Sequence, residues 1–416
     1  MALIKKPLNG MKDILPEEMA IRDYLIGIIK EVYRGYGFTP IETPAMEHIE
    51  NLLSKQGGDN EKLIFKVLKR GEKFNLASAE TESDLTDSGL RYDLTLPLAR
   101  FYSNNLSKLS SPFKALQVGS VWRADRPQKG RFRQFTQCDI DILGDESNLS
   151  EIELILATTQ ALSRLCPQNK FKVKINDRRI LKAMVSYAGI EEEFSEKVLI
   201  ILDKMDKIGI EGVKTELEEL GIKNESIEKY ISLFSLNEDV KEFVKVLNSD
   251  EVIKVGENLS EILEIVSNSK TCDFELVFDS TLVRGMGYYT GTIFEVSMEG
   301  FSGAVAGGGR YDKMIGKFTG KDTPACGFSI GFERIMTILT DLGFSVKNKL
   351  SKKAFLFEKG TDTNKLLEIL DKAKLEREKG HVVLVAKMNK NKKFQKEQLL
   401  AEGYEEFLEF YREALK

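Results

Sequence analysis

The segment from Val121 to Gly144 constrains the fold of this chain more than any other stretch. It reads VWRADRPQKGRFRQFTQCDIDILG, in which two arms of alternating apolar and polar residues flank a cationic loop. Alternation with a period of two is typical of β-strands, so the segment predicts a β-hairpin. Five cations fall within eleven positions of the loop: Arg123, Arg126, Lys129, Arg131 and Arg133. This charge predicts a site for a polyanion.

The second arm of the hairpin has an apolar face and a polar face. Cys138, Ile140 and Ile142 share one face, whereas Phe135, Gln137, Asp139 and Asp141 share the other. Two carboxylates on one face of an otherwise apolar strand are costly unless they bind something. We therefore interpret the polar face as part of a pocket for a polar small molecule beside the polyanion site.

The loop itself carries groups suited to phosphate. A guanidinium is a planar fork that matches phosphate oxygens, so Arg123 and Arg131 are candidate phosphate clamps. Gly130 between them allows the backbone to turn tightly beside a ligand. A nucleotide, a nucleic-acid backbone, or both would suit this loop.

Length and composition narrow the class of protein. The 416 residues predict two or three domains, and a net charge of −4 argues against indiscriminate nucleic-acid binding while permitting local basic patches. The four cysteines are far apart, which favours reduced thiols in a cytoplasmic protein over a zinc site or disulfides. We expect no signal peptide and no membrane span. With only two histidines, histidine-based catalysis is not expected.

The rest of the chain reads as strands interrupted by helices. Apolar spacing predicts helices from about Pro16 and over 149–165, whereas LRYDLTLPLARF at 90–101 is expected to continue a strand-and-hairpin region. From about 178 to 269, Lys and Glu dominate and apolar residues recur at helical spacing, which indicates a helical insertion. Strands return after it, and a short αβ tail with strands AFLF and HVVLVA ends the chain. This order favours an α+β body over a doubly wound parallel sheet.

Four further motifs are candidates for the site. Arg91, Asp93 and Thr95 are expected on one strand face, and LVRGMGYYTGTIFE presents Arg284 before a glycine-bearing turn and two tyrosines. The glycines of AVAGGGRYD fit neither a dinucleotide fingerprint nor a P-loop, so they indicate close approach of a flat ligand or another backbone. Arg334 opens a helix after a glycine-spaced strand, and the tail holds a lysine cluster around Phe394.

The order of these blocks resembles the histidyl-tRNA synthetase family of class II aminoacyl-tRNA synthetases. The likeness rests on GMKDILP, RYDLT, RADRPQKGRFRQFTQCDIDILG, LVRGMGYYTGTIFE, GGGRYD and PACGFSIGFERI, and it is dense over residues 8–160 and 271–340. The resemblance implies an antiparallel six- to seven-stranded sheet flanked by helices, a homodimer, and the substrates histidine, ATP with Mg²⁺, and tRNA. No protein-held metal is implied.

The resemblance also implies roles for single residues. Arg123 would hold the α-phosphate of ATP, Arg334 would meet its γ-phosphate, and Arg284 would stabilise the carboxylate and α-phosphate during attack. The histidine contacts would be Asp93, Thr95, Gln137, Asp141, Tyr288 and Tyr289. We expect tRNA contacts, which the lysine-rich composition suggests, at Lys387, Lys390, Lys392, Lys393 and Phe394.

By the same resemblance, residues 1–175 and 271–346 would form two parts of a catalytic domain, with a helical insertion at 176–270. Residues 351–416 would form an abbreviated anticodon-binding-like domain. The chain departs from the family where Gly287 replaces an Asp found in many members and Asp93 replaces Glu. The alternatives are a non-catalytic regulatory subunit of ATP phosphoribosyltransferase, which the short tail favours, and a class II ligase of another specificity, which RGMGYYTG opposes.

Overall fold

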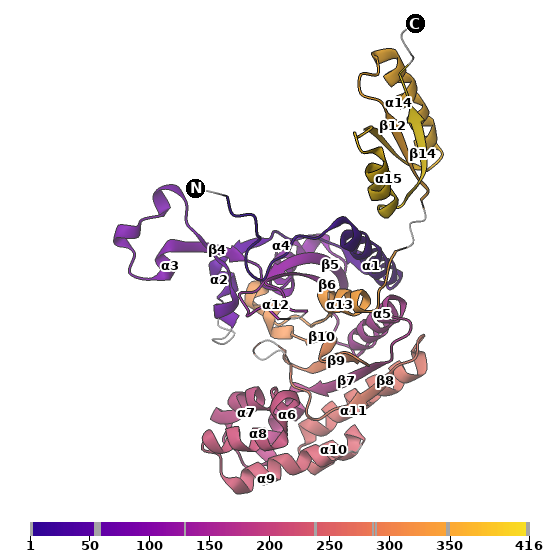
Figure 1. Ribbon diagram of the computed structural model, residues 1–416. Helices are drawn as coiled ribbons and strands as arrows, with labels where there is room; N and C mark the ends of the chain where they lie inside the picture. The colour runs from indigo at the N-terminus through magenta and orange to yellow at the C-terminus, as the bar shows by residue number, and fades with distance from the viewer. Residues whose placement is uncertain are drawn as a thin grey trace. The chain divides into compact units, whose positions relative to one another are not determined.

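The computed structural model describes residues 3–53, 60–128, 130–236, 239–284, 287, 289–346 and 350–412. Lys129 and Tyr288 therefore lie outside the described residues. The chain divides into two compact units, residues 1–344 and residues 345–416, which are described separately (Figure 1).

The first unit is built on a mostly antiparallel sheet of eight strands in the order β1-β5-β6-β11-β10-β9-β7-β8. Six neighbouring strands from β5 to β7 pair antiparallel, and β1 and β8 add parallel edges. Their bounds are β1 Thr39–Pro40, β5 Phe113–Trp122, β6 Gln134–Leu143, β7 Phe171–Asp177, β8 Glu275–Phe278, β9 Thr292–Met298, β10 Ala304–Arg310 and β11 Ala325–Gly331. This α+β architecture confirms the predicted fold class.

The predicted hairpin is confirmed as β5 and β6. The two strands pair from Phe113 opposite Leu143 to Trp122 opposite Gln134, which leaves residues 123–133 as the connecting loop. Cys138, Ile140 and Ile142 are buried in the main apolar core, as the alternation predicts.

Helices cover the apolar face of this sheet. The helices α1 (Pro16–Gly35) and α5 (Leu149–Leu165) fall where the apolar spacing places them, and α13 (Phe332–Asp341) follows β11 directly. Their buried residues join those of the central strands in one core, which also includes the helical insertion. The opposite face of β6 remains available for the site.

The expected strand at 90–101 is wrong. The strand β4 (Thr86–Leu90) ends first, and helix α4 (Thr95–Asn105) begins at Thr95. Asp93 accepts a hydrogen bond from the backbone N–H of Leu96 at 3.1 Å, which satisfies one of the unpaired donors at a helix start. Leu98, Ala99 and Tyr102 are buried on one helix face, so the apolar spacing is helical. Helix α12 (Asp312–Thr319) packs beside α4 over the same end of the sheet.

Smaller elements complete this unit. A three-stranded sheet in the order β2-β4-β3 contains β2 (Met46–His48) and β3 (Lys66–Leu68), with the short helices α2 (Ile49–Leu52) and α3 (Glu82–Leu85) beside it. Between β7 and β8 the regular elements of the described chain are helices, and Figure 1 shows these helices grouped together. They are α6 Arg178–Tyr187, α7 Ser195–Leu202, α8 Met205–Glu219, α9 Asn224–Ser232, α10 Val240–Val246 and α11 Asp250–Ser269.

The second unit is a three-stranded parallel sheet with two helices. Its strands are ordered β13-β12-β14, and its elements are β12 Lys352–Phe357, α14 Thr363–Glu378, β13 Val382–Lys387, α15 Lys392–Ala401 and β14 Tyr404–Phe410. The residue pattern of the tail predicted only two strands, because the glutamates of YEEFLEF obscure the apolar residues of β14. An edge strand exposes one side to water, so Glu405 and Glu406 are tolerated there.

No helix in the described part of the chain combines the length and the apolar character needed to cross a membrane.

Candidate active site

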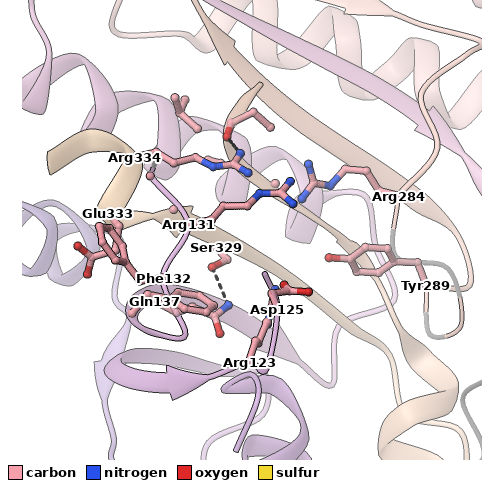
Figure 2. A pocket seen from close by; sticks show the side chains of 17 residues that line it. Arg123, Asp125, Arg131, Phe132, Gln137, Arg284, Tyr289, Ser329, Glu333 and Arg334 are labelled. Carbon is pink, nitrogen blue, oxygen red and sulfur yellow. Dashed lines mark hydrogen bonds between the residues drawn. The ribbon is translucent and has the colours of Figure 1, made fainter. Parts of the chain in front are cut away.

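A cavity of about 340 Å³ opens on the polar face of the central sheet. It lies between the hairpin loop, strands β10 and β11, and the start of α13 (Figure 2). Its polar lining consists of Arg123, Asp125, Arg131, Gln137, Arg284, Tyr289, Ser329, Glu333 and Arg334. The structure therefore brings together cationic and polar residues that are separated by up to 211 positions in the chain (334 − 123 = 211).

Three arginines converge on one side of this cavity. Figure 2 shows the side chains of Arg131, Arg284 and Arg334 directed toward one another. Burial lowers the pKa of Arg334, and the neighbouring charges of Arg131 and Arg284 lower it further. Cations held this close repel one another unless an anion lies between them, so the arrangement suits a polyphosphate.

Arg284 is held in place by strands β9 and β10. Its guanidinium forms an ion pair with Glu295 and lies against Gly307, where an added Cβ would be 2.3 Å from the Arg284 Cζ. Arg334 in turn donates a hydrogen bond to the backbone carbonyl of Ala304. Both cations are therefore anchored to the sheet beside the cavity.

Arg123 leaves the end of β5 and approaches the cavity from another side. Its Nε donates to the carbonyl of Tyr92 at 2.9 Å, and its guanidinium lies 5.1 Å from the ring centroid of Phe135. These contacts orient the side chain while leaving its charge at the cavity wall. Gly130 in the same loop has a φ of 73°, a conformation that favours glycine, as expected for a tight turn.

The start of α13 is fixed by a buried ion pair. Arg22 of α1 donates to Glu333 at 2.7 and 2.8 Å and to the hydroxyl of Thr136 at 2.9 Å. The backbone N–H of Thr136 also donates to Glu333, at 3.2 Å. Because Arg334 follows Glu333 directly, this network positions the cation as well as the helix.

The polar face of β6 lies opposite small residues of β11. Gln137 faces Gly331, Asp139 faces Ser329 and Asp141 faces Gly327. An added Cβ at Gly327 would be 2.0 Å from Oδ1 of Asp141, so glycine is required for this carboxylate to fit. The predicted face is therefore confirmed as a polar stripe beside the cavity.

Two buried acceptor atoms on this stripe have no hydrogen-bond partner among the described residues: Oε1 of Gln137 and Oδ2 of Asp141. The other carboxylate oxygen of Asp141 accepts from the hydroxyl of Tyr311 at 2.6 Å. Buried acceptors are normally paired, because leaving them unpaired costs free energy. N–H donors of a ligand suit such acceptors; Gln137 lines the cavity, whereas Asp141 lies on the stripe beside it and does not.

Burial dominates the titration of the three acidic groups below the cavity. It raises the pKa of Asp141 to about 7, with the Tyr311 hydroxyl opposing the shift and the charge of Asp93 adding to it. Burial also raises the pKa of Asp93 and, more strongly, that of Asp139, where Asp141 adds to the effect and Arg123 opposes it. Three buried carboxylates favour a cationic ligand.

Asp93 and Thr95 do not line the cavity in the described structure. They lie at the start of α4 and not on a strand face, as noted above. Asp93 is buried, and its charge acts on both Asp139 and Asp141. Arg91, the third residue of the motif, has a structural role. Its guanidinium donates hydrogen bonds to the backbone carbonyls of Ser120 at 2.9 Å and Thr43 at 2.6 Å.

The glycine cluster of β10 allows the close approach of another backbone, as expected, because an added Cβ at Gly308 would be 2.0 Å from the carbonyl oxygen of Gly327. It also receives side chains. Gly307 accommodates Arg284, and an added Cβ at Gly309 would be 3.0 Å from the ring of Tyr289. Tyr289 lines the cavity, whereas Tyr288 lies outside the described residues. Gly287 has a φ of 115°, which disfavours any residue with a side chain.

The tail lysines belong to the second unit. Lys387, Lys390 and Lys393 are exposed, as is Phe394. Lys392 is engaged in an ion pair with Glu409, and the pKa of Glu409 falls to about 2 because Lys392 and Lys396 both bond to it.

Three polar residues at the site were not predicted from the sequence. Tyr311, Ser329 and Glu295 each contact a candidate residue. Tyr311 lies within the glycine motif, whereas the contacts of Ser329 and Glu295 depend on strand register, which the sequence does not specify. Asp139 was predicted on the polar strand face but was not assigned a contact with a substrate. Among the described residues there is no group of three or more His, Cys, Asp or Glu suited to hold a metal ion.

An antiparallel sheet whose hairpin loop and strand–helix junction surround one cavity with arginines defines a class II aminoacyl-tRNA synthetase-like catalytic fold. The family model described as Histidyl-tRNA synthetase matches residues 10–335, and the chain belongs to this family.

Relatives and solved structures agree with this assignment. A histidine–tRNA ligase from Leifsonia xyli subsp. xyli is 44% identical over 346 residues, which cover 80% of each chain. A probable histidine–tRNA ligase from Tropheryma whipplei is 40% identical over 419 residues, 97% of this chain and 95% of the relative. The histidyl-tRNA synthetase structure from Nostoc sp. PCC 7120 has a TM-score of 0.78 at 27% identity and covers 97% of this chain and 90% of its own.

A structure from Bacillus halodurans C described as an ATP phosphoribosyltransferase regulatory subunit/histidyl-tRNA synthetase has a TM-score of 0.79 at 21% identity, with full coverage of both chains. At that identity it supports the fold alone.

Proposed function

We propose that this protein is a histidine–tRNA ligase. In the first step the histidine carboxylate attacks the α-phosphate of ATP, the bond to the β-phosphate breaks, and histidyl-adenylate and pyrophosphate form. In the second step a terminal hydroxyl of the tRNA attacks the activated carbonyl, and AMP leaves. The observation that carries the proposal is one cavity lined by a cluster of arginines, beside a polar strand face on which two buried acceptors, of Gln137 and Asp141, have no partner among the described residues.

Positioning and charge stabilisation are sufficient for the first step, which needs no protein nucleophile. We assign the α-phosphate to Arg123 and the γ-phosphate end to Arg334, with Arg131 as a further phosphate contact. Arg284 would neutralise charge between the carboxylate and the α-phosphate as the new bond forms. Mg²⁺ would arrive with ATP as part of the substrate.

Histidine recognition is assigned to the acidic stripe. Gln137 and Asp141 hold acceptors that have no partner within the described part of the chain, and the imidazole and ammonium groups of histidine are N–H donors. Asp93 and Thr95 would act from the start of α4, and Tyr288 and Tyr289 would close the pocket. A site that pairs polar groups rejects amino acids that lack them by large factors.

The remaining assignments follow the family. We propose a cytoplasmic homodimer in which residues 1–175 and 271–346 form the catalytic domain around an insertion at 176–270. Residues 351–416 would read the anticodon, with the exposed tail lysines Lys387, Lys390 and Lys393, together with Lys392 and Phe394, contacting the tRNA. The alternative of a non-catalytic regulatory subunit is not better supported. A protein that does not activate an amino acid with ATP has no need for the cluster of arginines at the cavity.

The test is ATP–pyrophosphate exchange with each of the twenty amino acids, followed by charging of a total tRNA pool. We expect exchange with histidine and charging of one isoacceptor group. Exchange with another amino acid would replace the assigned specificity, and the absence of any exchange would favour a non-catalytic protein.

A further inference from the structure

A row of directly paired residues crosses the floor of the cavity. Gln117 of β5 faces Asp139 of β6, which faces Ser329 of β11, and Ser329 faces Gly307 of β10. Asp139 is 3% exposed and does not itself line the cavity, whereas Ser329 and Gln137 do. A buried carboxylate directly behind two lining residues can reach a ligand by hydrogen bonds only through them.

The hydrogen bonds along this row have a defined direction. The hydroxyl of Ser329 donates to Oδ1 of Asp139 at 2.5 Å. Nε2 of Gln137 donates to the oxygen of Ser329 at 3.2 Å (Figure 2). Nε2 also makes a longer contact of 3.5 Å to Oδ2 of Asp139. Because a hydroxyl has one proton, Ser329 can donate to Asp139 and then only accept from Gln137.

This direction determines which end of the Gln137 amide meets a ligand. With its N–H group turned to Ser329, Gln137 is left with Oε1 as a buried acceptor that has no partner among the described residues. An amide in the opposite orientation would offer N–H donors to the cavity and would oppose a substrate ammonium or imidazole N–H.

We propose that Asp139 is a positioning residue for the amino-acid substrate: through Ser329 it orients Gln137 so that an acceptor faces the N–H donors of histidine. This inference rests on the proposed function. Burial and the charge of Asp141 raise the pKa of Asp139, whereas the Ser329 hydroxyl and Arg123 oppose that shift, and the cation of a bound substrate would act with them to favour the ionised carboxylate.

The isosteric variant Asp139→Asn tests the proposal, because an Asn amide can donate to Ser329 and reverse the bonds. In ATP–pyrophosphate exchange by the full chain, we expect its KM for histidine to rise by about tenfold or more, as a misdirected hydrogen bond to a charged group implies. We expect kcat and the KM for ATP to change by less than about twofold, since ground-state histidine binding is what is lost.

Two further variants separate positioning from stability. Ser329→Ala removes the relay without touching the carboxylate and should raise the KM for histidine in the same way. The double variant should be no worse than the more affected single variant, because both changes break one chain of bonds. Glu47→Gln is the matched control, since Glu47 is buried in β2, pairs with Arg100 and does not line the cavity. Its KM for histidine should not change.

The outcomes distinguish the two proposals. If the unaltered protein shows no histidine-dependent exchange, the proposed function fails and the relay fails with it. If exchange is normal but Asp139→Asn and Ser329→Ala keep the original KM for histidine, the relay alone is overturned. Equal increases in KM for histidine and for ATP would also overturn it, because they indicate general damage to the site.

Discussion

The guanidinium of Arg284 lies directly over Gly307, in the space that a side chain at that position would occupy. An added Cβ would be 2.3 Å from the Arg284 Cζ, a distance that real side chains do not tolerate. The absence of a side chain at Gly307 therefore leaves room for Arg284, which presents its cation to the cavity.

Gly307→Ala should displace Arg284 and lower the rate of ATP–pyrophosphate exchange by roughly tenfold or more, because small misplacements of a catalytic group are costly. Gly27→Ala in α1 is the control, since nothing lies within 4 Å of a Cβ added there. Equal activity of both variants would show that Arg284 does not need this position.

Arg284→Ala should retain the fold and lose exchange by about a hundredfold or more, in line with the removal of one charge-stabilising donor. The fold is expected to survive because Arg284 is partly exposed, with 30% of its side chain accessible. Circular dichroism and exchange kinetics together check this prediction. An active variant would refute the role assigned to Arg284.

Asp141 makes the stability of the free protein depend on pH. Its pKa is about 7 in the folded protein against an ordinary value of 3.8, so the folded state holds a proton that the unfolded chain releases. The stability from this proton is present at low pH and is lost as the pH rises through about 7. Asp141→Asn lacks this titration. The melting temperature of the variant relative to the unaltered protein should therefore increase between pH 5 and pH 7 (about the range that linkage predicts) and then level off.

A constant difference in melting temperature across that range would contradict the raised pKa of Asp141. Histidine binding is a separate readout, which Asp141→Asn should weaken because a buried acceptor is replaced by an amide.

Arg22→Ala should destabilise the first unit by about 3 kcal/mol, because Glu333 would keep a buried charge without its partner. Both side chains are less than 10% exposed, so water cannot replace the lost contacts. Arg164→Ala is a matched control, since its ion pair with Glu31 lies at the surface and should contribute little. Thermal denaturation of the two variants gives the comparison, and similar melting temperatures would argue against a structural role for the buried pair.

Removal of residues 351–416 should spare adenylation and weaken tRNA charging, because these residues form a separate compact unit. Charging by the full chain should also fall as salt concentration rises, if exposed tail lysines neutralise phosphates. A matched variant of the full chain, Lys390→Glu with Lys393→Glu, should lose charging but not exchange. Unchanged charging by the truncated protein would show that the tail does not contact tRNA.

Local patterns were sufficient to predict much of this fold. The alternation around Gln137 predicted a strand with two different faces, and the spacing in α1 and α5 predicted helices, because burial on one side imposes a period on the sequence. The same reasoning failed for 90–101, where the polar residues Arg91 and Asp93 suggested a strand although the following apolar residues have helical spacing. It also missed β14, whose exposed glutamates hide its apolar face.

The charged residues and the polar strand faces could be identified without coordinates, since these properties depend on residue type and on a period of two or of three to four. Which of these residues meet depends on the folded arrangement of the chain. Strand register places Ser329 opposite Asp139 and Gly307 below Arg284, and register depends on pairings between strands far apart in the chain. The direction of the bonds from Gln137 to Asp139, and hence which end of the Gln137 amide has no partner among the described residues, exists only once those strands are side by side.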